Sequence, residues 1–400
     1  MKSRALAQNL ALSALSVMFV FGLCEVAVRL LVSNRGGKEQ REAFRYATYD
    51  PVLGWRKTPG SEVTFSRPDF VTTFRINSQG LRDRERPVAK PSGEFRVVAL
   101  GDSFIEAYTV GDADMPTVRL REELAAGGCA VDVINGGTFG YSTDQEYLAY
   151  DRDLYRYQPD VVVLFVYHND IPPLLWGPDK PVLDFSTEPP RVSNEPVKSR
   201  FSIGPPPVTG PRSETASFFR SQALTLLRAR VDRTPPWIRD RLEKLGLVPP
   251  ILTFGLNDEM FLYARQPPEH LLRAIKAFQQ TIGALNRRTA RDGARLLVAY
   301  IPARFEVNAD DWERTQTKYQ IGNKWFDRRS LVFRLMTAAF QEGVEFVDLS
   351  DAIKAAQGFF SSPYLDNDNH WNARGSAVGA RAVASKLQQL RWAPNCGPSR

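Results

Sequence analysis

The sequence predicts an α/β domain in which a parallel sheet lies between two layers of helices. Short apolar runs alternate along the chain with stretches of amphipathic, helical character. Because the strands of such a sheet are buried on both faces, they appear as continuous apolar runs, and this alternation is typical of a three-layer sandwich. The composition agrees with a folded domain of this kind. A chain of 400 residues that is 43% hydrophobic and 24% charged can form a full core, which excludes general disorder.

The expected elements follow one another as strand and helix after residue 92. Strands are expected at 95–100, 131–134, 161–166, 296–301 and 345–347. Helices are expected at about 115–127, 144–156, 267–291, 327–342 and 372–390. Together these elements define a domain over residues 93–392, which a short tail at 393–400 follows.

Residues 1–34 predict a membrane anchor. Lys2 and Arg4 precede a mostly apolar run from Ala5 to Val32, which as an α-helix would span about 40 Å at ~1.5 Å per residue. No small-x-small cleavage site follows the run, so a single uncleaved helix in contact with membrane lipid is favoured over a signal peptide. Basic residues flank both ends of the segment, so the positive-inside rule leaves its orientation open.

Two further regions differ from the strand–helix pattern. Residues 35–92 predict a linker and a small β-hairpin, because β-branched and aromatic residues at 63–65 and 71–76 are separated by turn-forming residues. Residues 171–264 contain repeated Pro-Pro pairs, which exclude sheet core, and one candidate helix near 214–232. We expect an insertion between the third and fourth strands that shapes substrate entry; a poorly ordered excursion is the alternative.

Charge and cysteine content exclude several classes of protein. The net charge of +7 comes from basic residues mixed with 45 acidic ones, which favours a solvated surface over nucleic-acid binding. Three cysteines exclude a disulfide-dense scaffold, and no Cys/His cluster has zinc-ligand spacing. Cys129 and Cys396 are expected at the same edge of the sheet, where an oxidising compartment would permit a disulfide.

The first candidate for chemistry is Ser103, in the segment Gly101-Asp102-Ser103. A strand ends here and a helix can begin, so the hydroxyl lies at the carboxyl edge of the sheet with a helix amino end behind it. That position suits a nucleophile beside a developing anion. The alternative is a capping box formed with Glu106, in which Ser103 only satisfies backbone donors.

Two more segments with candidate site residues lie at the ends of the second and third expected strands. Gly140 lies in a glycine-rich turn after the second strand, where its backbone amide is a candidate oxyanion donor. Asn169 ends the third strand, and its side-chain amide could face the same oxyanion, or it could serve only as part of a turn-forming Asn-Asp pair. A serine nucleophile also needs a base, and His370, which follows Asp366 and Asp368, is the natural one among three histidines.

These four segments, in this order, resemble the sequence blocks of the SGNH/GDSL hydrolase superfamily, over roughly residues 93–178 and 265–390. The resemblance implies a flavodoxin-like sheet. It also implies Ser103 as nucleophile, His370 as base, and an oxyanion hole formed by Ser103, Gly140 and Asn169. The lead-in segment from Leu53 to Trp55 is similar to that of membrane-anchored bacterial members.

Two positions differ from the usual blocks of this superfamily. Tyr167 stands where the third block usually has glycine, which reshapes the pocket wall without removing Asn169. The last block reads Asp368-Asn369-His370-Trp371 and is similar to the Asp-x-His-Trp form of alginate-acetylation-type members. The resemblance therefore implies Asp368 as the orienting carboxylate, with Asp366 as the runner-up.

The implied function is a serine esterase that acts on a small-molecule or polysaccharide ester through an acyl-enzyme. An O-acetyltransferase that modifies a cell-envelope polysaccharide is the alternative, and a non-catalytic envelope scaffold is a third possibility of another class. No metal or organic cofactor and no nucleic acid is implied. The expected location is the bacterial inner membrane, with a single-pass anchor and the catalytic domain outside the cytoplasm.

Overall fold

The computed structural model describes residues 46–67, 69–175, 180–198, 258–319, 321–358, 361–366 and 368–394, together with Ser16 and Val20. The chain divides into two compact units, and residues 45–201 with 256–400 form the unit described below. No helix in the described ranges combines the length and apolar character needed to cross a membrane. The expected anchor at 1–34, apart from two isolated residues, and the expected helix near 214–232 lie outside these ranges.

The centre of this unit is a parallel sheet of five strands in the order β11-β10-β7-β5-β6. The strands are β5 (Phe95–Leu100), β6 (Val131–Asn135), β7 (Val161–Val166), β10 (Arg295–Tyr300) and β11 (Glu345–Asp348). In chain order their positions correspond to 2-1-3-4-5, the order of flavodoxin-like sheets. The predicted α/β fold with a parallel sheet is thereby confirmed.

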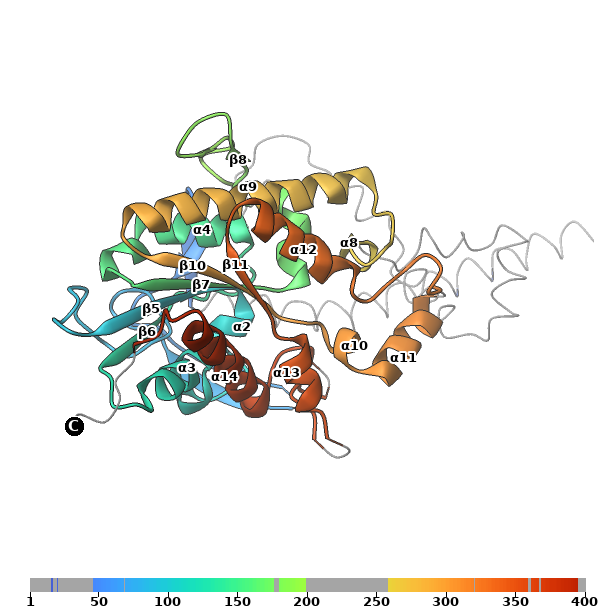
Figure 1. The fold of residues 1–400 in the computed structure, drawn as a ribbon. Helices are drawn as coiled ribbons and strands as arrows, with labels where there is room; N and C mark the ends of the chain where they lie inside the picture. Colours follow the sequence, from blue (N-terminus) through green and yellow to red (C-terminus); the bar gives the residue numbers. More distant parts are fainter. Residues whose placement is uncertain are drawn as a thin grey trace, which may run out of the picture. The chain divides into compact units, whose positions relative to one another are not determined.

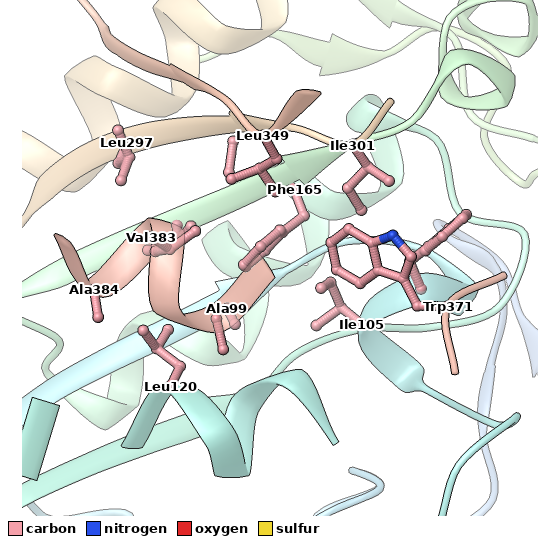
Figure 2. Packing of buried hydrophobic residues seen from close by; sticks show 14 of the residues in the cluster. Ala99, Ile105, Leu120, Phe165, Leu297, Ile301, Leu349, Trp371, Val383 and Ala384 are labelled. Carbon is pink, nitrogen blue, oxygen red and sulfur yellow. The ribbon is translucent and has the colours of Figure 1, made fainter. Parts of the chain in front are cut away.

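Helices cover both faces of the sheet (Figure 1). One layer consists of α3 (Pro116–Ala125) and α14 (Ala373–Gln389), and the other of α4 (Thr143–Arg152), α9 (Glu269–Arg291) and α12 (Ser330–Gln341). Figure 2 shows Leu120, Val383 and Ala384 from the first layer in one apolar cluster with Ala99 and Phe165 of the sheet. Each such large apolar side chain contributes about 1.5–3 kcal/mol when fully buried.

The ends of the predicted elements shift by a few residues, and several short helices were not predicted. The helix expected at 144–156 ends at Arg152, and the chain continues as the 3-10 turn Leu154–Tyr157, which Gln158 closes with a φ of 52°. The additional helices are α10 (Arg304–Val307), α11 (Ala309–Tyr319) and α13 (Ser350–Ala355), whereas α2 (Ser103–Glu106) begins where a helix start was expected.

The lead-in consists of two antiparallel strand pairs. The expected hairpin is β3 (Glu62–Ser66) with β4 (Val71–Arg75), and β1 (Ala47–Asp50) with β2 (Gly54–Lys57) precedes it. The pair β1–β2 was not expected, because Gly-Trp-Arg-Lys lacks β-branched residues. It is held instead by burial, since Trp55 of β2 is fully enclosed and contacts Phe139 and Tyr141.

The described parts of the insertion are short. They are the 3-10 turn Pro172–Leu175, the two-residue strands β8 (Leu183–Asp184) and β9 (Arg191–Val192), and α8 (Asp258–Phe261). The small sheet formed by β8 and β9 is separate from the central sheet, as expected for so proline-rich a segment.

Cys129, between α3 and β6, is disulfide-bonded. Its partner lies outside the described residues. The sulfur of Cys129 is 3.7 Å from the carbonyl oxygen of Pro394, two residues before Cys396. This proximity supports the expected pairing with Cys396, which stays a prediction.

Candidate active site

Ser103 begins α2 directly beyond the carboxyl end of β5. The cap of this helix is Asp102, whose Oδ1 accepts a hydrogen bond of 2.9 Å from the backbone N–H of Phe104. The Ser103 hydroxyl is therefore not engaged in capping, and its Oγ lies 2.7 Å from Nε2 of His370. Gly101 permits this tight exit from the strand, because a Cβ there would lie 2.5 Å from Cγ1 of Ile105.

Asp368 is the carboxylate that contacts His370. Its Oδ1 lies 2.5 Å from Nδ1 of the imidazole and also accepts the backbone N–H of His370 at 2.9 Å. Partial burial opposes the charged form, but hydrogen bonds from His370 and Tyr108 outweigh it and lower the pKa of Asp368 to about 2. Asp366, the runner-up, accepts a bond from Arg304 through its backbone carbonyl, and no side-chain bond between Asp366 and His370 is present.

A narrow loop holds this pair of residues in place. Tyr364 and Trp371 form a β-bridge across it, and the N–H of Leu365 donates to the carbonyl of His370 at 3.0 Å. Trp371 is buried against Gly375 and Gly379 of α14, where a Cβ on either glycine would approach the indole to within 2.8 Å. The Trp of the Asp-x-His-Trp block therefore fixes the loop to the helix that follows it.

Tyr108 also contacts Asp368, and none of the four sequence blocks predicted this contact. Its phenol donates to Oδ2 of Asp368 at 3.2 Å and lies 3.3 Å from Nδ1 of His370. Burial raises the pKa of this phenol, so it stays protonated and remains a donor. Phe65 and Phe70 of the lead-in pack against its ring. A contact between segments so distant in the chain leaves no signal in a single sequence.

Asn169 lies near the nucleophile, as expected. Its Nδ2 donates to Oδ2 of Asp102 at 3.3 Å, and the Ser103 hydroxyl is equally close to that oxygen. A side-chain amide carries two N–H donors, so one remains for an oxyanion. The Oδ1 of Asn169 is buried and has no hydrogen-bond partner among the described residues.

Gly140 occupies a turn beside the same edge of the sheet. The N–H of Tyr141 donates to the carbonyl of Thr138 at 3.2 Å, and Gly140 has a φ of 65°. Among the described residues, no acceptor pairs with the backbone N–H of Gly140 or of Ser103. Both amides are therefore available as donors to a developing oxyanion.

The other two histidines lie away from this arrangement. Burial lowers the pKa of His168 to about 3, and its Nδ1 lies 3.0 Å from the Tyr263 hydroxyl. His270 pairs with Asp258 at 3.0 Å at the start of α9. Neither hydrogen-bonds to Ser103, so His370 is the base that the geometry supports.

A cluster of buried carboxyl groups lies near the nucleophile, formed by Asp102, Asp144, Glu146 and Asp170. Burial raises the pKa of Asp144, Glu146 and Asp170, and the charge of Lys180 works against that increase. The described residues contain no group of three or more His, Cys, Asp or Glu placed to hold a metal ion. The arrangement brings a serine hydroxyl, an imidazole and a carboxylate into contact, which are groups that acyl transfer requires.

The likeness to SGNH hydrolases is a family-model match over the carboxyl-terminal part of the chain. Residues 256–400 match a family model described as an SGNH hydrolase-like domain, acetyltransferase AlgX. This match agrees with the superfamily that the sequence blocks resemble, and it is confined to this part of the chain. The matched range contains Asp368 and His370, whereas Ser103 precedes it.

Beyond the family model, the likeness of this chain to known proteins is structural. No curated protein matches the chain. A putative lipolytic G-D-S-L protein from Desulfitobacterium hafniense is 12% identical, with coverage of 72% of this chain and 98% of that one and a TM-score of 0.36. A lipase/acylhydrolase from Enterococcus faecalis is 11% identical (74% and 96% coverage, TM-score 0.37). The Axe2 acetylxylan esterase from Geobacillus stearothermophilus, as a catalytic mutant, is 13% identical (76% and 97% coverage, TM-score 0.37).

Proposed function

We propose that the protein is a serine esterase that works through an acyl-enzyme on Ser103. The observation that carries the proposal is the chain of contacts from Ser103 Oγ to His370 Nε2 at 2.7 Å, and from His370 Nδ1 to Asp368 at 2.5 Å. Such a chain activates a hydroxyl that is otherwise a weak nucleophile.

In the first half-reaction, Ser103 Oγ bonds to the ester carbonyl carbon while His370 takes the hydroxyl proton. The amides of Ser103 and Gly140 and the side chain of Asn169 stabilise the tetrahedral oxyanion. The carbon–oxygen bond to the alcohol then breaks, and His370 returns the proton to the departing oxygen. Water, activated by the same imidazole, attacks the acyl-enzyme and releases the acid and free Ser103.

The second candidate is an O-acetyltransferase, in which a sugar hydroxyl replaces water as the acceptor. Two observations favour it: the family model that matches residues 256–400 is named for the acetyltransferase AlgX, and the last block has the Asp-x-His-Trp form. The two candidates share the acyl-enzyme and differ only in its acceptor. For these two reasons, a polysaccharide ester is the substrate class that we propose for either reaction.

The experiment holds an acetyl donor constant and titrates in oligosaccharides from the cell envelope. An esterase releases acetate at a rate that the acceptor does not change, whereas a transferase yields acetylated sugar at the expense of acetate. Ser103→Ala abolishes both products if the proposal is right, and Asp366→Asn, the matched acidic control, retains them. Full turnover by Ser103→Ala would contradict both candidates and leave the non-catalytic scaffold.

We further propose that the domain is held outside the cytoplasm at the bacterial inner membrane. The apolar run from Ala5 to Val32 supports an anchor, and the disulfide at Cys129 supports an oxidising compartment, since such bonds are rare in the cytosol. An alkaline phosphatase fusion after Arg400 should be active, because that enzyme needs export. Fluorescence from a green fluorescent protein fusion at the same position, with an inactive phosphatase fusion, would contradict this topology.

A further inference from the structure

The glycine-rich loop that carries Gly140 is held by three side chains from outside the central sheet. Trp55 Nε1 donates to the carbonyl of Phe139 at 3.1 Å, and Lys180 Nζ donates to the carbonyl of Gly140 at 2.7 Å. Lys57 Nζ donates to the carbonyl of Gly137. The lead-in strand β2 therefore contributes two of the three donors, although it lies outside the predicted catalytic blocks.

The turn from Thr138 to Tyr141 has its central peptide in one of the two common orientations. Gly140, at the third position, has a φ of 65°, whereas the φ of Phe139 is not positive. This combination, with the hydrogen bond from Tyr141 to Thr138, defines a type II turn. Type I differs from type II by a rotation of the central peptide through roughly half a turn, and glycine at the third position tolerates both.

That central peptide contains the carbonyl of Phe139 and the N–H of Gly140. Because a trans peptide is planar, its C=O and N–H point in opposite directions. The indole of Trp55 binds the carbonyl and so fixes the direction of the Gly140 N–H, the expected oxyanion donor. A rotation to type I would break this hydrogen bond and reverse the direction of the N–H.

Trp55 is itself held firmly. Its side chain is fully buried, and its ring contacts the rings of Phe139 and Tyr141 at centroid distances of 6.0 and 5.6 Å. The Tyr141 hydroxyl donates to the backbone carbonyl of Trp55 at 2.7 Å. The donor and the turn that it binds thus form one packed unit.

We infer that Trp55 is a positioning residue for the oxyanion hole, whose indole N–H holds the Phe139–Gly140 peptide in the type II orientation. The inference rests on the proposed function, since it assigns a role only if Ser103 forms a tetrahedral oxyanion. Trp55 acts on the transition state through Gly140 and has no contact with the reacting atoms. Its loss should therefore lower kcat and leave KM unchanged.

The test is Trp55→Phe, which removes the N–H and keeps an aromatic ring. Removing one oxyanion donor outright costs about 10²–10³-fold, so misorienting one is expected to lower kcat about 10- to 100-fold. Affinity for an alkylboronic acid, which forms a tetrahedral adduct on the nucleophile, should fall by a similar factor. Affinity for the carboxylate product, which makes no such adduct, should stay as in the parent protein.

Trp312→Phe is the matched control. Trp312 lies in α11, away from the turn, and is also buried. Its indole N–H donates to Oδ1 of Asn323 at 3.3 Å. Its kcat and boronate affinity should equal those of the parent. An equal loss in both variants, or parental kcat and boronate affinity in Trp55→Phe, would overturn the inference.

If Trp55→Phe fails to fold, benzothienylalanine at position 55 replaces it, because this analogue keeps the bicyclic shape and lacks the N–H. The same losses are expected, and parental values would overturn the inference. Ser103→Ala distinguishes the positioning role of Trp55 from the proposed function. If it is inactive while the Trp55 variants are unimpaired, only the positioning role fails; if it retains turnover, the proposed function itself fails.

Discussion

At the scale of single residues, Tyr108 is the clearest addition to the predicted site. It binds the second oxygen of Asp368 and lies beside the imidazole of His370. Tyr108→Phe removes this donor, and since a hydrogen bond to a charged group contributes about 1.5–3 kcal/mol, we expect kcat to fall about 10- to 150-fold. KM should not change, and the measurement is steady-state kinetics on an activated acetate ester.

The control for Tyr108 is Tyr150→Phe, which removes a phenol that donates to Oδ2 of Asp292 at 2.9 Å away from the site. Its kcat should match that of the parent protein. Loss of stability without loss of kcat in Tyr108→Phe would assign Tyr108 a purely structural role.

The choice between Asp368 and Asp366 gives a second prediction. Loss of the corresponding carboxylate in trypsin lowers kcat by about 10⁴, and we expect a drop of that order for Asp368→Asn but parental kcat for Asp366→Asn. The reverse pattern would make Asp366 the orienting acid. The sequence blocks alone left both carboxylates possible, and the 2.5 Å contact with His370 distinguishes them.

Asp368 should also affect the free energy of unfolding in a pH-dependent way. The fold lowers its pKa from 3.8 to about 2, so its stabilising effect is fully present above about pH 4 and disappears as the pH falls to about 2. Urea unfolding of the parent and Asp368→Asn between pH 2 and 6 measures this. The difference between the two should shrink with acid; a difference that is constant over this range would contradict the shift.

At the scale of elements, the glycine-rich loop packs directly on α2, the helix that begins at Ser103. A Cβ on Gly137 would lie 2.3 Å from the backbone nitrogen of Glu106 and 2.5 Å from the carbonyl carbon of Ile105. Since backbone atoms cannot turn away as a side chain does, Gly137→Ala must displace α2. We expect a loss of about 1–3 kcal/mol in the free energy of unfolding, measured with urea, and a lower kcat.

Gly111→Ala is the control for this prediction, because a Cβ at Gly111 would have nothing within 4 Å. It should unfold and turn over substrate as the parent does. If Gly137→Ala is as stable and as active as the Gly111 variant, the loop and α2 are not tightly packed against each other.

The elements that the sequence predicted are those with a local signal. The run Val161–Val166 is continuously apolar and buried, and α9 presents a clear apolar stripe, so both were found within two residues. In contrast, α11 buries little besides Trp312, and β2 is stabilised by contacts with residues more than 80 positions away. Such elements depend on the completed fold and leave no periodic pattern.

The same distinction applies to the site. Ser103, Asn169 and His370 each follow a strand or precede a helix, so topology and block order were enough to predict that they lie close together. The roles of Tyr108 and of the Trp55 indole depend on contacts across 260 and 84 positions of the chain. Only the three-dimensional structure reveals contacts of that kind.

At the scale of the whole molecule, the cysteines test whether a disulfide links the C-terminal tail to the loop before β6. With three cysteines in the chain and Cys129 disulfide-bonded, a Cys129–Cys396 bond leaves Cys24 as the one free thiol. Thiol titration of the denatured, unreduced protein should find one thiol, and three after reduction. Three thiols before reduction, or a Cys129 peptide linked to Cys24 in a non-reducing digest, would contradict this pairing.

The central claim is that Ser103 is a nucleophile activated by His370. Intact-mass spectrometry after exposure to a fluorophosphonate tests it most directly, because the probe reacts with an activated serine whatever the natural substrate. We expect one adduct, located on the Ser103 peptide, absent from Ser103→Ala and formed at least about 10³-fold more slowly in His370→Ala. No adduct on the folded parent protein, or one that forms at the parental rate in Ser103→Ala, would contradict the claim.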